Sequence, residues 1–294
     1  MYIDGVFSGG GIKGFALIGA LQAIEERGLV FRRLAGTSAG AIISSFITAG
    51  YTSNDIVDMM NEMDLKMFLD TRTKFLPSAL TKWLFLYWKL GLYRGERLEK
   101  WVKEKLEARG VRTFGDLPPH SLRIVASDLT NGRMVVIPDD LLRYGISPET
   151  FSVAKAVRMS CSIPYFFEPV KLKSKDKTNL IVDGGVLSNF PIWLFDDDKR
   201  PKVRPVLGVK LSSKDEEREI NHIKNAIELF GALFDTMKDA HDARYISRRH
   251  ERNIIFIPTD HVLATEFTLT DERKKELLEL GKNRGREFLM KWSY

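Results

Sequence analysis

The chain has 294 residues, of which 44% are hydrophobic and 29% are charged, and its formal net charge is +6. This composition is ordinary for a soluble globular protein of one large or two small domains. The single cysteine, Cys161, excludes an internal disulfide framework and fits a reducing compartment. The sequence contains no C-x-x-C or H-E-x-x-H pattern and no nucleic-acid-binding signature. We therefore expect no metal, no cofactor and no nucleic-acid partner.

Residues 2–7 have the composition of a short strand, and a glycine-rich stretch, Ser8–Gly14, follows them. Asp4 and these glycines interrupt any apolar signal segment, so we expect no signal peptide and a cytoplasmic protein. Apolar residues at helical spacing over 15–24 predict a helix directly after the glycines. The unshielded N–H groups of Gly9–Gly11 would then lie at a helix N-terminus, where negative charge is stabilised.

A second glycine-flanked stretch is Gly36-Thr37-Ser38-Ala39-Gly40, which follows an apolar run that predicts a strand. A serine on such a strand-to-helix turn is how many hydrolases present a nucleophilic hydroxyl, and the bend favours glycine on either side. A helix is predicted over 39–49. The alternation of strand and helix over residues 1–50 predicts a parallel sheet with covering helices.

The next predicted helix begins near Ser53 and carries an apolar stripe that consists of Ile56, Met59, Met60, Met63 and Met67. Packing in the core is one interpretation of this stripe. A flexible wall for an acyl chain is the other, because methionine adapts to irregular ligands.

Residues 65–95 are predicted to form a cap segment. Its aromatic run over 83–93, with Lys82 and Lys89, is too short to span a bilayer, which needs about 20 residues. We expect no transmembrane helix here. The segment is either an interfacial surface that lies on lipid or a buried cap helix beside the site. Another amphipathic helix is predicted over 95–108.

An apolar strand over 179–183 places the carboxylate of Asp183 at its end, and Gly184 and Gly185 turn the chain away. The carboxyl ends of strands are where an open α/β sheet keeps its active site, which makes Asp183 a candidate catalytic residue. Further strands are predicted over 206–209 and 254–257. Thr270 is predicted to cap a final helix. Apolar residues over 220–237 alternate at three and four positions, which favours a helix packed on a sheet over a coiled-coil seam.

These elements, in this order, resemble the patatin-like phospholipase family in its single-domain bacterial form. Residues 124–132, 156–167 and 186–191 match further motifs of that family, and the resemblance spans about residues 3–210. It implies one three-layer α/β/α domain over 1–294 with a mainly parallel sheet, a cap at 65–95, and C-terminal helices with a late strand at 215–294. Met159 stands where the family often has alanine, and Tyr165 where it often has glycine. Both add bulk near the expected pocket, which leaves the acyl-chain preference open.

The resemblance implies a lipolytic serine acyl hydrolase, similar to a phospholipase A or a lysophospholipase. Ser38 would attack a lipid ester, and Asp183 would serve as its base in a Ser–Asp dyad. The N–H groups expected to hold the oxyanion belong to Gly9, Gly10, Gly11 and Ala39. The remaining motif glycines are Gly14, Gly36, Gly40, Gly184 and Gly185. Peripheral contact with a membrane, the oligomeric state and the exact lipid are left open.

Three alternatives compete with this interpretation. A histidine after Asp183 could complete a triad, and His261, which follows a predicted strand, is a better candidate than His222, His241 or His250. The pattern Gly9-x-Gly11-x-x-Gly14 also fits a dinucleotide-binding loop, with Arg32 and Arg33 suited to the 2′-phosphate of NADP. The third alternative is a non-catalytic lipid-binding or scaffold protein on the same fold.

Overall fold

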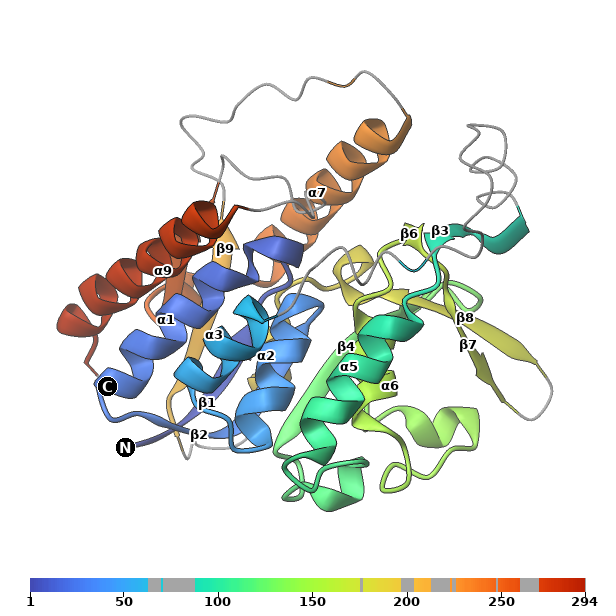
Figure 1. Cartoon of the computed structure of the whole chain (residues 1–294), viewed down its shortest axis with the longest axis horizontal. Coiled ribbons are helices and arrows are strands. Elements are labelled where there is room, and N and C mark those ends of the chain that lie inside the picture. Colours follow the sequence, from blue (N-terminus) through green and yellow to red (C-terminus); the bar gives the residue numbers. More distant parts are fainter. Residues whose placement is uncertain are drawn as a thin grey trace.

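The computed structural model describes residues 1–62, 70, 88–174, 177–196, 204–212, 223, 226–246, 248–259 and 270–293 (Figure 1). In this part of the chain an eight-stranded sheet has the order β10-β9-β1-β2-β4-β8-β7, and β5 pairs with β4. The strands of this sheet are β1 (Tyr2–Phe7), β2 (Val30–Thr37), β4 (Leu122–Asp128), β5 (Arg133–Ile137), β7 (Val170–Lys173), β8 (Thr178–Asp183), β9 (Val206–Ser212) and β10 (Ile254–Pro258).

Five of these strands, from β10 to β4, run parallel to their neighbours, whereas β5, β8 and β7 run antiparallel. The α/β fold with a mainly parallel sheet that the sequence predicts is therefore confirmed. Strand β8 was predicted over 179–183 but not its antiparallel direction, and β5 and β7 were not predicted. A separate two-stranded sheet, also not predicted, joins β3 (Gly91–Tyr93) to β6 (Tyr165–Phe167).

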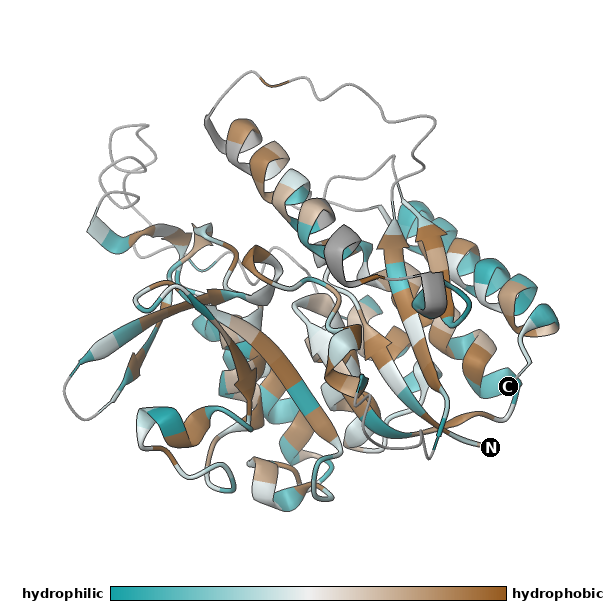
Figure 2. Ribbon diagram, turned by 180° about the vertical axis from the view of Figure 1, so that it is seen from behind, coloured by the Kyte–Doolittle hydropathy of each residue, from teal (hydrophilic) through white to brown (hydrophobic). Residues whose placement is uncertain are grey.

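The helices divide between the two faces of the sheet. They are α1 (Gly14–Glu26), α2 (Ala39–Thr48), α3 (Ser53–Asn61), α5 (Glu96–Glu107), α6 (Val153–Ser160), α7 (Ala226–Tyr245), α8 (Arg248–Glu251) and α9 (Asp271–Lys291). The larger core lies under α1, α2, α3, α5, α6 and α9. A smaller cluster around Phe190, Ile192 and Phe195 covers part of the other face, and Figure 2 shows α7 on that side.

The close crossing of α1 and α9 depends on glycines. A Cβ on Gly281 would lie 1.8 Å from the carbonyl oxygen of Ala16, and a Cβ on Gly19 would lie 1.9 Å from that of Leu278. Glu26 and Arg286 join the same helices through two hydrogen bonds of 2.8 and 2.9 Å. The C-terminal elements β9, β10 and α9 thus pack against the N-terminal ones, while the single domain over 1–294 stays a prediction.

The structure describes part of the predicted methionine stripe and little of the predicted cap segment. Ile56 and Met59 are buried in the larger core, which favours the packing interpretation of their stripe. Met63, Met67, Trp83 and most of the 65–95 cap lie outside the described residues, as do Ile220 and residue 222. Within the described part of the chain, no helix is long and apolar enough to cross a membrane.

Candidate active site

Ser38 occupies the turn between β2 and α2, where it is the N-cap residue of the helix. Its backbone φ of 53° is a positive value that residues other than glycine seldom adopt. Such backbone strain persists only where surrounding packing imposes it, and it clusters at functional sites. The residue is 6% exposed.

The flanking glycines impose this turn by close packing. A Cβ on Gly36 would lie 2.4 Å from the carbonyl oxygen of Gly40, and a Cβ on Gly40 would lie 2.2 Å from that of Phe7. Since real Cβ atoms cannot approach a backbone oxygen so closely, only glycine fits at either position. The start of α2 is therefore pressed against the end of β1, as the glycine-flanked motif predicts.

Asp183 ends β8 and lies at the start of a 3₁₀ turn, η5 (Gly184–Val186). The position at the carboxyl end of a strand is as the sequence predicts, but the direction of that strand was not predicted. Strand β8 runs antiparallel to β4 and stops at the register pair Ala126–Asp183. Strand β5 lies along the other edge of β4, so β2 shares one edge of β4 with β8 and ends there at the register pair Thr37–Val125. The two strands thus reach the same level of β4 from opposite directions.

The turn over 184–188, directly after Asp183, packs against the end of β2 next to Ser38. A Cβ on Gly184 would lie 2.3 Å from the carbonyl oxygen of Val125 and 2.9 Å from Cγ2 of Thr37, so this glycine permits a close approach. The Thr37 hydroxyl donates a hydrogen bond of 3.0 Å to the carbonyl oxygen of Ser188. The turn after Asp183 is therefore fixed to the residue that precedes Ser38.

The carboxyl group of Asp183 is buried beside the Ser38 hydroxyl. Burial raises the pKa of Asp183 to about 6, against smaller lowering effects from the Gly185 N–H, the Ser38 hydroxyl and the Lys238 ammonium. Oδ1 accepts the Gly185 N–H at 2.7 Å. Oδ2 is buried and has no hydrogen-bond partner of regular geometry within the described residues. One oxygen is thus fixed, and the other is available to a proton.

The end of α6 and the residues directly after it connect Ser38 to Asp183, a role that the sequence motif did not reveal. The backbone N–H of Ser38 donates to the Ser160 hydroxyl at 2.9 Å, and that hydroxyl donates to the carbonyl oxygen of Val125 at 2.6 Å. The Asp183 N–H donates to the carbonyl oxygen of Ser162 at 2.9 Å. Burial raises the pKa of Cys161, which lies between these serines, so its thiol stays protonated.

The glycine loop lies against this turn. A Cβ on Gly9 would lie 3.2 Å from the Cβ of Ser38, and a Cβ on Gly14 would lie 3.3 Å from that of Ala39. The Gly9 N–H is already bonded to the carbonyl oxygen of Asn189 at 3.0 Å. No backbone carbonyl in the described residues accepts the N–H of Gly10, Gly11 or Ala39. Gly9 therefore shapes the loop, and the other three keep their donors.

Helix α7 covers the far side of Asp183, which the sequence did not indicate. A Cβ on Gly185 would lie 3.2 Å from the ring of Phe234 and 3.3 Å from the stem of Lys238. The helix is anchored by a buried ion pair of 2.9 Å between Lys210 on β9 and Asp242. Asp242 also accepts the Phe190 N–H at 3.1 Å.

Other candidate residues lie elsewhere. No described histidine is hydrogen-bonded to Ser38 or Asp183, and His250 pairs with Asp196 at 2.7 Å. His222 and His261 lie outside the described residues. The described part of the chain contains no cluster of His, Cys, Asp and Glu that could hold a metal ion. Both Met159 and Tyr165 were expected to add bulk near the pocket. Met159 is fully buried in the core, whereas Tyr165 is 51% exposed, so the two residues have different surroundings.

The arginines of the NADP alternative are at the wrong end of the sheet. Arg33 pairs in register with Asp4, near the start of β1, whereas Phe7, the last residue of β1 before the glycine loop, pairs with Gly36. A dinucleotide held at the glycine loop would need its ribose-binding group at the carboxyl end of β2. Arg32 and Arg33 are near the opposite end, which contradicts this alternative.

Comparisons with known proteins identify the family. Residues 5–196 match the family described as patatin-like phospholipase. The uncharacterized protein YqhO of Bacillus subtilis is 59% identical over the full length of both chains. The triacylglycerol lipase ptl3 of Schizosaccharomyces pombe is 27% identical over 64% of this chain and 38% of its own. The crystal structure of VipD from Legionella pneumophila has the same fold, with a TM-score of 0.59 over 99% of this chain and 67% of its own, at 20% identity. The chain belongs to the patatin-like phospholipase family.

Proposed function

We propose that the protein is a serine acyl hydrolase that cleaves carboxylic esters of lipids, with Ser38 as nucleophile and Asp183 as general base. The observation that carries this proposal is the buried carboxyl of Asp183 beside the strained Ser38, with a pKa raised to about 6. A carboxylate of ordinary pKa is a poor base for a hydroxyl group. The raised pKa makes it a stronger base that is still ionised at neutral pH.

In the first half of the reaction, the Ser38 hydroxyl transfers its proton to Asp183 as Oγ bonds to the ester carbonyl carbon. The tetrahedral intermediate then collapses, the bond from carbon to the alcohol oxygen breaks, and Asp183 returns the proton to the leaving alcohol. Ser38 is left as an acyl ester. Loose contacts between nucleophile and base are common without substrate, which fits the missing regular hydrogen bond at Oδ2.

In the second half, Asp183 takes a proton from water, whose oxygen attacks the acyl carbon. The bond between that carbon and Oγ then breaks, the fatty acid leaves, and the proton returns to Ser38. Both steps develop negative charge on the same carbonyl oxygen. The donors for this oxyanion are the N–H groups of Gly10, Gly11 and Ala39, and one such donor contributes about 3 kcal/mol to transition-state stabilisation.

Membership of the patatin-like phospholipase family supports lipid esters as the substrate class. The relative named as a triacylglycerol lipase supports acylglycerols within that class. Phospholipids and lysophospholipids present the same ester carbonyl to a serine. A phospholipase A or lysophospholipase activity therefore belongs to the same proposal.

A serine-reactive fluorophosphonate tests the nucleophile directly. We expect the wild-type protein and Cys161→Ala to be labelled at Ser38, and Ser38→Ala to remain unlabelled. Mass spectrometry of a mixed lipid extract should then show released fatty acids with the wild type and none with Ser38→Ala or Asp183→Asn. A folded wild-type protein that neither reacts with the probe nor releases fatty acid would instead favour a non-catalytic lipid-binding or scaffold protein.

A further inference from the structure

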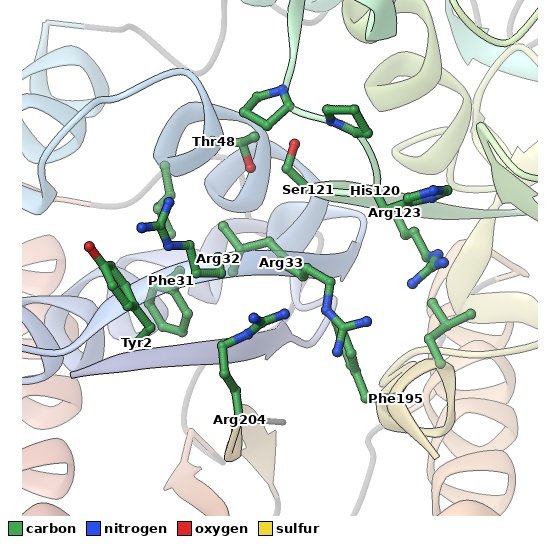
Figure 3. A pocket seen from close by; sticks show the side chains of 15 residues that line it. Tyr2, Phe31, Arg32, Arg33, Thr48, His120, Ser121, Arg123, Phe195 and Arg204 are labelled. Carbon is green, nitrogen blue, oxygen red and sulfur yellow. The ribbon is translucent and has the colours of Figure 1, made fainter. Parts of the chain in front are cut away.

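A cavity of about 960 Å³ lies at the end of the sheet opposite Ser38 (Figure 3). Its wall includes Tyr2 at the start of β1, Arg33 near the start of β2, and Ser121 just before β4. Ser38 follows the other end of β2, five residues after Arg33, which corresponds to roughly 16 Å along a strand. This cavity is therefore a different place from the site described above. Its size falls in the range of small-molecule pockets, about 300–1,000 Å³.

Arginine side chains dominate the polar lining of the cavity. Arg32 and Arg33 come from β2, Arg123 from β4, and Arg204 from the segment before β9. Figure 3 shows the guanidinium groups of Arg33 and Arg204 near one another, with Arg32 and Arg123 on either side in this view. Three segments remote in sequence thus bring four cationic groups to one concave surface.

The described carboxylates do not balance this charge. Asp4 is fully buried and accepts both Arg33, at 2.5 Å, and Arg204, at 3.1 Å. Arg123 pairs with Asp139 at 2.7 Å. Among the described residues, two carboxylates therefore face four guanidinium groups.

Arg32 has no carboxylate partner in the described part of the chain and is stacked over the ring of Tyr2, 3.8 Å from its centroid. The wall also contains unused hydrogen-bonding capacity. Arg33 Nε and Ser121 Oγ are buried, and neither has a hydrogen-bond partner within the described residues. Buried polar atoms are normally satisfied, so two unsatisfied atoms in one wall suggest a missing partner. Positive charge and open donors point to the same kind of ligand, an anion.

We propose that this cavity binds a small anion that carries two or more phosphate groups. The planar guanidinium fork matches phosphate oxygens in a bidentate way, and several arginines on one surface are typical of phosphate recognition. A single carboxylate would neutralise only one of the excess charges. Two phosphates match an excess of two or more and can reach arginines on different strands. The anion is either a soluble polyphosphate or nucleotide, or the headgroup of a polyphosphorylated lipid.

Calorimetry with tripolyphosphate and with ATP tests the soluble source, and sedimentation with vesicles that contain a phosphoinositide tests the lipid source. The variant is the Arg32→Ala/Arg123→Ala double, which spares both arginines that neutralise Asp4. The control is the Arg143→Ala/Arg284→Ala double, which removes the same charge from exposed surface positions. We expect saturable binding in at least one arm, at least tenfold weaker in the cavity variant and within twofold of wild type in the control.

The outcomes separate this proposal from the proposed hydrolase. Ser38→Ala should bind the anion as the wild type does, because the cavity lies at the other end of β2. If the cavity double variant does not fold, Arg32→Gln alone, at an exposed position, should still weaken binding severalfold. No saturable binding in either arm, or equal losses in the cavity and control variants, would overturn the proposal, and neither result bears on Ser38.

Discussion

The Ser160 hydroxyl accepts the backbone N–H of Ser38 at 2.9 Å, and so holds the one residue of this turn with a left-handed backbone. It also donates to the Val125 carbonyl oxygen on β4. A side chain outside the proposed dyad thus holds the backbone of the proposed nucleophile. We therefore expect Ser160 to be a positioning residue that links the Ser38 turn to β4.

Ser160→Ala should slow acylation without unfolding the protein. The change leaves the Ser38 N–H buried without a partner, at a cost of about 1–3 kcal/mol. If that cost falls on the turn, the rate of fluorophosphonate labelling should drop roughly tenfold or more. The KM for ester hydrolysis should change little. Ser45→Ala is the control, because the Ser45 hydroxyl bonds only within α2, to the Ala41 carbonyl oxygen. Equal labelling rates in Ser160→Ala and wild type would show that Ser160 has no positioning role.

Hydrolysis should depend on the ionisation of Asp183. Because burial raises the pKa of this carboxyl to about 6, the base loses its proton-accepting form as the pH falls through 6. We expect kcat/KM to be level above pH 7 and roughly tenfold lower at pH 5. A pH–rate profile on a neutral ester measures this directly. A profile that stays flat down to pH 4.5 would contradict the assignment of Asp183 as base.

The raised pKa of Asp183 also predicts how the stability of the fold depends on pH. The sign is opposite to that of an acidic residue whose pKa is lowered by folding. The folded-state pKa of Asp183 lies above its ordinary value of 3.8, so the folded protein binds the proton more tightly than the unfolded chain. Ionisation therefore destabilises the fold at pH values above 6, by about 3 kcal/mol, and this penalty vanishes below about pH 4. Asp183→Asn should gain stability at pH 8 and gain little at pH 4. Urea denaturation at both values checks this, and a gain of the same size at both would refute it.

The crossing of α1 and α9 should not tolerate a methyl group. Gly281→Ala would place Cβ 1.8 Å from the Ala16 carbonyl oxygen, so the helices must separate, at a cost of about 1–3 kcal/mol. Gly231→Ala in α7 is the matched control, because nothing lies within 4 Å of its Cβ position. That change should be neutral or stabilise the helix by up to about 1 kcal/mol. Thermal denaturation of the two variants should therefore shift in different directions.

Three exposed apolar residues around the small β3–β6 sheet are suited to contact with a lipid surface. Trp88 is 70% exposed, Leu90 is 42% exposed, and Tyr165, paired in register with Gly91, is 51% exposed. We expect Trp88→Ala to weaken co-sedimentation with phospholipid vesicles at least fivefold, since burial of a large side chain contributes about 1.5–3 kcal/mol. Leu142→Ala, equally exposed on another part of the surface, should leave binding unchanged. Equal binding by both variants would argue against this surface.

The sequence located the candidate residues better than it explained them. Ser38 and its glycines could be predicted because a strained turn leaves a local signature. Asp183 could be placed at the end of a strand, but the direction of β8 could not be predicted, because it depends on strand pairing that no local pattern records. Ser160 lay within a matched motif, yet its role depends on a contact 122 positions away. The arginine-lined cavity could not be predicted, because Arg123 and Arg204 reach it from segments remote from Arg32.

The placement of β1 and α1 has a consequence for synthesis of the protein. Strand β1 lies between β2 and β9, and the helix that follows it packs on α9, so that Glu26 meets a partner 260 positions further along. A nascent polypeptide that has left the ribosome only in its first half therefore exposes an unpaired strand edge and a bare helix face. Such surfaces are prone to aggregate until the C-terminal elements are available to cover them. The start of α2, next to Ser38, packs against the end of the same strand, so we expect the Ser38 turn to reach its final geometry only late in synthesis.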